Sequence, residues 1–245
     1  RSFGDWYQKR EDAVRVALIP GVESFDGDVG DLLMGKAGGD EGLLGNNVMF
    51  LSAHADDAGA DGNGIKLPGF AFVVDLANPN DADESLARLF RAALVDLEKN
   101  NDLPGNAWNN GTEKHQGITI TYASREVAEG EVQMIPASAR YKNWFIVSSS
   151  RQLCRGIIDQ LSSRGVTVLK GEDLALDLRF DELSRFFAVN QRQYEAELVR
   201  SGRPVEQAKV DYQNIEKFLK GMKYLRCSSS ASSGTFEFSL EGEFK

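Results

Sequence analysis

The residue types best suited to chemistry in this chain occur together at positions 52–57, which read Ser-Ala-His-Ala-Asp-Asp. This segment directly follows residues 48–51, a short apolar run that is typical of a buried strand. A neutral imidazole and carboxylates can hold a zinc ion, and a neighbouring carboxylate can act as a base toward zinc-bound water. Metal-assisted hydrolysis is therefore the first enzymatic hypothesis.

The segment resembles the His-Pro-Asp-Asp motif of the zinc-dependent de-N-acetylases of the N-acetylglucosaminyl-phosphatidylinositol type. The resemblance implies that His54 and Asp57 bind zinc and that Asp56 is the general base. The chain departs from the motif at Ala55, which replaces the proline, and its only other histidine is His115, in a polar stretch. The parallel βαβ pattern of that family is also missing. We therefore favour the alternative, in which His54 ends a strand and both aspartates belong to a loop.

Two Asp-rich stretches contain the ligand types that calcium prefers, which are carboxylates and carbonyls of a flexible loop. The members are Asp26, Asp28 and Asp31 in the first stretch and Asp56, Asp57, Asp61 and Asn63 in the second. An EF-hand loop needs Glu at its twelfth position, where these stretches have Ala37 and Pro68. We therefore expect solvated turns here and no cofactor, with zinc or calcium as the alternatives.

One phrase, Asp-Leu followed by a loop and an amphipathic helix, occurs at 75–90 and again at 177–187. The repetition predicts two diverged halves that share a strand-to-helix design. Asp75 and Asp177 occupy equivalent positions, and in a duplicated fold they can converge as paired carboxylates. The favoured alternative is that each aspartate accepts backbone hydrogen bonds where its loop begins.

The remaining reactive or recognition side chains give weaker indications. With two histidines in the chain, no Ser-His-Asp or Cys-His triad can be argued. Trp108 lies among asparagines, which suggests an exposed platform for stacking a sugar. Cys154 falls on the apolar stripe of a predicted helix and Cys227 in a predicted strand. Two buried free thiols are the favoured interpretation, and a disulfide between them stays open.

Hydrophobic periodicity predicts the elements that must position these residues. Helices are expected at 4–18, 81–97, 150–165, 181–200 and 204–221, the last two as an antiparallel hairpin. Strands are expected at 48–51, 70–76, 118–123, 132–134, 144–147, 174–178, 224–229 and 235–244, and residues 104–117 are expected to be a polar loop. In the last strand Phe236, Phe238, Leu240 and Phe244 alternate with polar residues, which predicts one buried face and one solvated face.

This order predicts the α+β class, with a largely antiparallel sheet, helices packed on one face and two diverged half-repeats. We expect an N-terminal helix and a Gly/Asp-rich irregular segment at 1–47. A first α+β half is expected at 48–165, and a second half at 166–245 with the helical hairpin and a C-terminal β-hairpin. A chain of 245 residues is long enough to bury a core without a metal or a disulfide.

Composition and charge limit the partners. The chain is 42% hydrophobic and 27% charged, which is ordinary for a globular protein and excludes a disordered one. A net charge of −9 argues against nucleic acid and against docking on anionic lipid. No apolar run is long enough to span a bilayer. The chain begins at Arg1 rather than Met, so we expect a processed form that has lost a leader or a membrane anchor.

From residue 70 onward, the order of predicted elements resembles uncharacterised bacterial families of exported or membrane-anchored proteins. The stretches at 70–76, 143–150 and 234–238 carry this resemblance. It implies a periplasmic or cell-surface protein without known enzymatic activity, and it supplies no functional residues. The leading hypothesis is a non-enzymatic envelope domain that binds or scaffolds an unknown protein or small molecule. The alternatives are a deacetylase-like zinc hydrolase using His54, Asp56 and Asp57, and a module that binds an apolar ligand such as lipid.

Overall fold

The computed structural model describes residues 21–35, 42–55, 59–60, 66–77, 79–100, 108–126, 132–164, 174–232 and 235–245. In this part the chain is α+β and its sheets are largely antiparallel, which confirms the predicted class. The chain forms two compact units. Unit 1 comprises Arg1–Ser52, Gly69–Glu126 and Met134–Gly165, and unit 2 comprises Ala53–Pro68, Val127–Gln133 and Val166–Lys245. The predicted helix at 4–18 lies outside the described residues.

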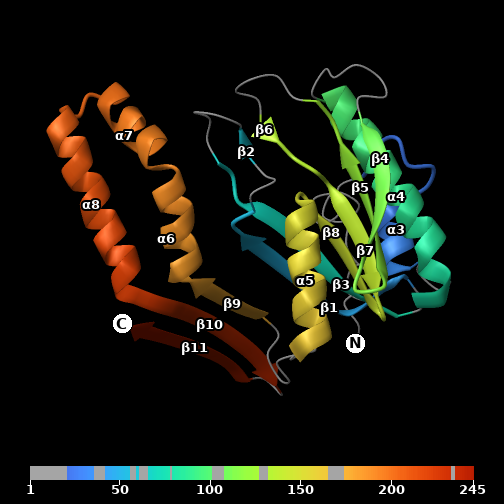
Figure 1. Ribbon diagram of the computed structural model, residues 1–245. Helices are drawn as coiled ribbons and strands as arrows, with labels where there is room; N and C mark the ends of the chain where they lie inside the picture. The colour runs from blue at the N-terminus through green and yellow to red at the C-terminus, as the bar shows by residue number, and fades with distance from the viewer. Residues whose placement is uncertain are drawn as a thin grey trace. The chain divides into compact units, whose positions relative to one another are not determined.

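Unit 1 is built on a six-stranded sheet with the order β1-β3-β8-β7-β5-β4 (Figure 1). Its strands are β1 (Leu44–Ala53), β3 (Gly69–Leu76), β4 (Asn109–His115), β5 (Ile118–Ser124), β7 (Ala137–Tyr141) and β8 (Trp144–Ser148). The pairs from β3 to β4 are antiparallel. The start of β1 lies beside the end of β3, because the Ala77 N–H donates to the Leu43 carbonyl at 3.0 Å.

The helices of unit 1 are α3 (Val29–Met34), α4 (Pro79–Asn100) and α5 (Arg151–Arg164). Ala123 packs against Phe90 and Leu94 of α4. The preceding residue, Tyr122, contacts Arg151 of α5 instead, with 4.6 Å between the guanidinium carbon and the ring centroid. Because successive side chains of a strand point to opposite faces, α4 and α5 cover opposite faces of the sheet (Figure 1). The helix placement thus differs from the expected packing on one face.

The central strands explain why this sheet has helices on both sides. Val73 of β3 and Ile146 of β8 are 0% exposed on one face. On the other face Val74 and Phe145 pack against the cluster that contains Leu86 of α4. A strand that is buried on both faces has a continuous apolar run rather than an alternating one. Residues 70–74 and 144–147 have such runs.

Strand β4 replaces part of the loop that we expected at 104–117. The hairpin between β4 and β5 turns at Gln116 and Gly117, whose φ values are 50° and 79°. Two consecutive positive φ angles are the mark of a type I′ hairpin turn, so the chain reverses direction at Gln116 and Gly117. The sequence pattern failed here because β4 is a polar strand at the edge of the sheet, without apolar alternation.

Unit 2 contains a three-stranded antiparallel sheet with the order β11-β10-β9 (Figure 1). Its elements are β9 (Leu174–Arg179), α6 (Phe180–Val189), α7 (Gln191–Arg200), α8 (Val205–Gly221), β10 (Met222–Ser232) and β11 (Thr235–Phe244). Two short strands, β2 (Gly59–Ala60) and β6 (Val132–Gln133), pair with each other. The strand expected at 132–134 therefore lies outside the meander, whose middle strand is β7. The rings of Phe187 and Tyr212 stack at 4.9 Å and hold α6 against α8.

A break at Asn190 divides the helix that we expected at 181–200. Asn190 is 7% exposed. Its amide nitrogen donates to the carbonyls of Lys66 at 2.8 Å and Phe186 at 3.0 Å, and its amide oxygen accepts from the Lys66 N–H at 2.7 Å. The side chain thus satisfies both backbone groups of a residue 124 positions away. Local periodicity cannot show such a long-range contact.

Candidate functional site

The structure describes only part of the predicted zinc segment. His54 directly follows β1 and is partly buried, as expected for a residue at the end of a strand. Asp56 and Asp57 lie outside the described residues, so their roles as general base and zinc ligand stay predictions. Within the described ranges, no three His, Cys, Asp or Glu side chains come together in a way that could hold a metal ion.

The first Asp-rich stretch has a structural use. Asp28 is the N-cap of α3, and its carboxylate accepts a hydrogen bond from the Asp31 N–H at 2.8 Å. Side-chain oxygens at this position satisfy backbone donors that the first turn leaves unpaired. This arrangement fits the solvated turn that we favoured over calcium. In the second stretch, Asp56, Asp57, Asp61 and Asn63 all lie outside the described residues.

Asp75 and Asp177 have separate partners in different units. Asp75 accepts hydrogen bonds from the side-chain amides of Asn143 at 2.5 Å and Asn47 at 3.4 Å, where we expected backbone donors. Gly45 leaves room for this carboxylate, because a Cβ there would lie 2.6 Å from its oxygen. Asp177 forms an ion pair with Arg179 at 3.2 Å. Each aspartate thus has a local role, and a paired-carboxylate site stays a prediction.

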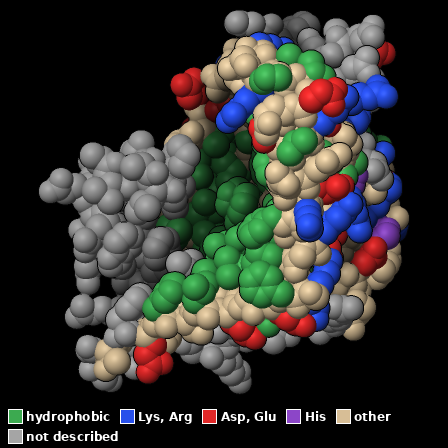
Figure 2. Space-filling model, turned by 90° about the vertical axis from the view of Figure 1, so that its left-hand side faces the viewer, with side chains coloured by type: hydrophobic (Ala, Val, Ile, Leu, Met, Phe, Trp, Pro, Cys, Tyr) green, Lys and Arg blue, Asp and Glu red, His purple; other side chains and the backbone are tan. Residues whose placement is uncertain are grey.

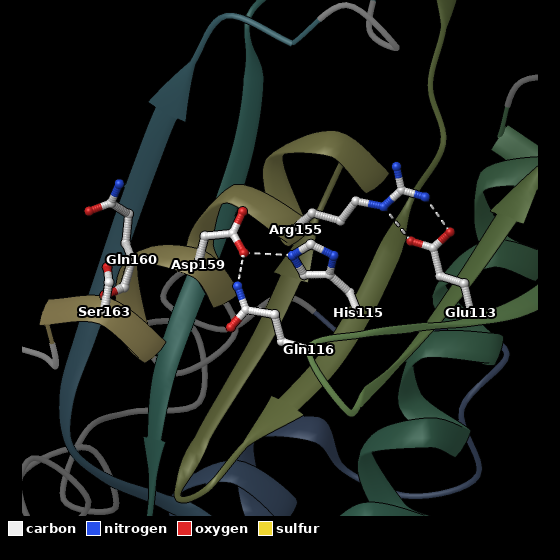
Figure 3. A network of polar contacts seen from close by, with 7 residues as sticks. All are labelled: Glu113, His115, Gln116, Arg155, Asp159, Gln160 and Ser163. Carbon is white, nitrogen blue, oxygen red and sulfur yellow. Dashed lines mark hydrogen bonds and ion pairs between the residues drawn. The ribbon is translucent and has the colours of Figure 1, made fainter.

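A polar network joins the edge strand β4 to helix α5 (Figure 3). Glu113 and His115 are two residues apart on β4, and Arg155 and Asp159 are four residues apart on α5. Two strand residues advance by about 6.8 Å and four helix residues by about 6.0 Å, so the two rows stay in step. We call these four side chains and Gln116 the β4–α5 clasp.

The Glu113 end of the β4–α5 clasp is a two-pronged ion pair. Arg155 donates to one carboxylate oxygen of Glu113 through Nε at 2.6 Å and to the other through Nη2. Arg151 lies 3.8 Å away, and the Glu113 side chain is 19% exposed. The hydrogen bond from Arg155 is the main cause that holds the pKa of Glu113 below its usual value, and the charges of Arg155 and Arg151 add to it.

The His115 end of the β4–α5 clasp resembles half of a catalytic arrangement. His115 Nε2 lies 2.6 Å from a carboxylate oxygen of Asp159, and Gln116 donates to the same oxygen at 2.5 Å. A carboxylate that orients an imidazole serves catalysis only when the imidazole can activate a nucleophile or a water. The Ser163 hydroxyl, one turn beyond Asp159, donates to the Gln160 carbonyl at 3.4 Å instead.

Cys154 does not supply the nucleophile either. Burial, with a smaller contribution from the negative charge of Glu113, raises the pKa of this thiol to about 12. A thiol with such a pKa stays protonated at neutral pH and is a poor nucleophile. Cys154 and Cys227 are both free. The β4–α5 clasp is therefore best explained as a tie between an edge strand and a helix.

Trp108 is not the exposed sugar platform that the sequence suggested. Its side chain is 8% exposed and packs with Phe90 and Leu94 of α4. Its backbone N–H donates to Glu98 at 3.3 Å. The polar neighbours misled the interpretation because they begin an edge strand, whereas Trp108 itself enters the core between sheet and helix.

Apolar side chains at the surface are the feature that the sequence misjudged most. We expected the apolar face of β11 to be buried, yet Phe238, Leu240 and Phe244 are 65%, 62% and 70% exposed. The run at 48–51, also expected to be buried, has Val48 at 58% and Phe50 at 61%. Hydrophobic side chains gather densely on the face of the protein drawn in Figure 2, with charged side chains around them. The exposed apolar side chains of β1 and β11 are the candidate binding sites.

The sequence hypotheses missed the β4–α5 clasp, although a signal was present. Glu113 and His115 at i and i+2 give one polar row, and residues 151, 155 and 159 at i and i+4 give another. Matching the two rows required knowing that β4 is a strand and that it lies beside α5.

Comparison with known proteins adds no relative: no family model, no curated protein and no solved structure matches the chain. None of the helices in the described part is long and apolar enough to cross a membrane. The resemblance to bacterial envelope families and the location that it implies therefore stay predictions.

Proposed function

We propose that this chain is a non-enzymatic binding domain of the cell envelope, which holds an extended segment of a partner protein against β1. One observation carries the proposal. Val48 and Phe50 of β1 and Phe70 and Phe72 of β3 are between 44% and 61% exposed, and the Phe50 and Phe72 rings lie 5.2 Å apart. Side chains two apart on a strand share a face, so these residues form one apolar face, the β1–β3 face.

The position and composition of β1 favour a strand as the partner. β1 is an edge strand of the six-stranded sheet, and residues 44–53 contain no charged residue and no proline. Edge strands are commonly protected from pairing by charge or proline, and β1 has neither. A peptide that pairs with such an edge gains backbone hydrogen bonds, and its alternate side chains can pack on the β1–β3 face.

The polar groups support binding over catalysis. The carboxylates of Glu113 and Asp159 are engaged within the β4–α5 clasp, and the Cys154 thiol is buried with a raised pKa. Aromatic side chains at a surface are the type that dominates the energy of protein interfaces. The envelope location rests on the pattern-level resemblance of residues 70–245.

Photocrosslinking in cells tests the proposal. A benzoylphenylalanine at position 50 should give one discrete protein adduct, and the same residue at Arg91, an exposed position on α4, should give none. Phe50→Pro should abolish binding to the captured protein, because proline removes a backbone donor. Equal capture at both positions, or none at position 50, would contradict the proposal.

Metal analysis tests the competing hydrolase. Purified protein that holds one zinc per chain, and loses it in His54→Ala, would replace the binding function with the zinc-dependent reaction that His54, Asp56 and Asp57 suggest. We expect no stoichiometric zinc in either protein.

A further inference from the structure

The three-stranded sheet of unit 2 has one apolar face and one polar face. Residues directly opposite each other in an antiparallel pair share a face. The apolar rows are Leu240–Cys227–Leu176, Gly242–Leu225–Leu178, Phe238–Ser229 and Phe244–Met222. Four of these side chains, Leu176, Phe238, Leu240 and Phe244, are 50% to 70% exposed. We call this surface the β9–β11 face.

The opposite face of the same sheet is well suited to water. Its rows contain Glu241, Arg226 and Asp177, and next to them Glu243, Tyr224 and Arg179. The Tyr224 hydroxyl donates to Glu241 at 2.6 Å. Because this face is charged and internally bonded, the β9–β11 face is the side of the sheet that requires a partner layer.

The area of the β9–β11 face suits a second copy of the chain. Three strands about 4.8 Å apart and up to ten residues long, at about 3.4 Å per residue, cover roughly 400–500 Å². Two copies packed face to face therefore bury about 1,000 Å², which is near the lower limit for a specific interface. Two sheets packed in this way about 10 Å apart form a β-sandwich.

Charge disfavours the other symmetric arrangement, in which two β11 edges pair. Antiparallel pairing that keeps apolar side chains on one side, with long overlap, places Glu237 opposite Glu241 or opposite Glu243 of the second copy. Like charges directly opposite each other destabilise a strand pair. Face-to-face packing avoids this, because the glutamates of β11 point away from the β9–β11 face.

We propose that the β9–β11 face binds the same face of a second copy, forming a two-fold dimer with a six-stranded sandwich between the chains. Leu240 lies in the Leu240–Cys227–Leu176 row, one of the two inner rows of the face, and is the anchor of the interface. The dimer does not involve β1, because the β9–β11 face belongs to unit 2.

Sedimentation equilibrium of the full chain tests the dimer. The wild-type protein should have twice the chain mass of 27.0 kDa at micromolar concentrations. Leu240→Lys places two uncompensated charges in the interface and should weaken the dimer by roughly 30-fold or more. Ser239→Lys, on the same strand but the other face, should leave the mass unchanged, as should Phe50→Lys on the β1–β3 face. Far-UV circular dichroism checks that all variants are folded.

Cys227 gives a test without mutation, since it lies in the Leu240–Cys227–Leu176 row and Cys154 is buried. A bulky maleimide on Cys227 should convert the dimer into monomers. A wild-type chain that stays monomeric up to about 100 µM would overturn the proposal. A Leu240→Lys variant that keeps the doubled mass would overturn it equally.

Discussion

The two sheets of this chain differ in how far other elements cover their apolar faces. The six-stranded sheet of unit 1 has α4 on one face and α5 on the other, and Val73, Ile120 and Ile146 are 0% exposed. The three-stranded sheet of unit 2 contacts α6 and α8 mainly through β10, and Leu240 is 62% exposed. The centre of the first sheet is covered on both faces within its own unit and only its β1–β3 face is open, whereas the second sheet leaves the apolar face of its strands largely exposed.

The apolar pattern of a strand therefore does not by itself specify which side chains are buried. The strands of both sheets contain Phe and Leu, but a side chain is buried only when another layer covers it. A covered face stabilises the fold, and an uncovered face is available for binding. Stability should therefore depend mainly on unit 1, and recognition on the β1–β3 and β9–β11 faces.

A substitution in the core of unit 1 should lower the free energy of unfolding the most. Ile146→Ala should reduce the free energy of unfolding by about 2–4 kcal/mol, because it leaves a cavity between sheet and helix. Leu240→Ala should cost less than about 0.5 kcal/mol in the monomer, since that side chain is already largely in water.

Urea unfolding followed by tryptophan fluorescence measures the loss for Ile146→Ala, because Trp108 and Trp144 are buried in unit 1. Circular dichroism follows both units. With both variants measured at a dilution where the chain is monomeric, equal losses for Ile146→Ala and Leu240→Ala would mean that the open face is covered within the monomer, and the comparison between the two sheets would fail.

A buried polar anchor in unit 2 gives the next effect. Asn190→Ala removes both hydrogen bonds that the Asn190 side chain makes to the backbone of Lys66. We expect a loss of about 1–3 kcal/mol. Hydrogen exchange at the Lys66 and Leu67 amides should accelerate, whereas Gln191→Ala, at the neighbouring exposed position, should change neither the stability nor the exchange. Unchanged exchange would show that Asn190 does not anchor this segment.

The β4–α5 clasp gives an intermediate effect that depends on pH. Glu113→Gln should cost about 1–2 kcal/mol at neutral pH, because it removes the charge-assisted bonds to Arg155. Since the pKa of Glu113 is lowered in the folded state, this stability is present above the usual glutamate pKa and is lost as pH falls through the folded value.

Urea midpoints of the wild type and Glu113→Gln should therefore converge as the solution is acidified toward pH 3. Glu197→Gln, which removes an exposed pair with Arg200, is the matched control and should change little at any pH. If the difference in urea midpoint between the wild type and Glu113→Gln stays constant with pH, the ion pair with Arg155 is not the cause of that difference.

The Cys154 thiol should make a small contribution to stability that depends on pH. Its pKa is raised to about 12 in the folded state, so its contribution to stability is complete below the pKa of the unfolded thiol and is lost as pH rises toward 12. Between pH 7 and 9 the wild type should lose about 1 kcal/mol relative to Cys154→Ala. Native Cys227 should also react with iodoacetamide before Cys154. Rapid alkylation of Cys154 would show that α5 opens easily.

Much of the architecture is predictable from residue patterns, and the failures have identifiable causes. Continuous apolar runs predict β3 and β8, and the spacing of Leu86, Phe90 and Leu94 predicts α4. Strand β4 was missed because a polar edge strand has no apolar alternation. The break at Asn190 was missed because it serves a residue far away in the sequence. The partners within the β4–α5 clasp were missed for the same reason.

Residue patterns alone are enough to predict the α+β class, the strand-to-helix phrase that occurs twice, and the alternation of Phe and Glu along β11. These features depend on period and on local turn chemistry, which neighbouring residues fix. The three-dimensional fold was needed to show which apolar faces are covered and which charges meet across β4 and α5. It was also needed to show that Trp108 is buried while Phe238 is exposed. Burial depends on contacts between distant segments, so an alternating strand predicts two faces but does not say which of them meets a partner.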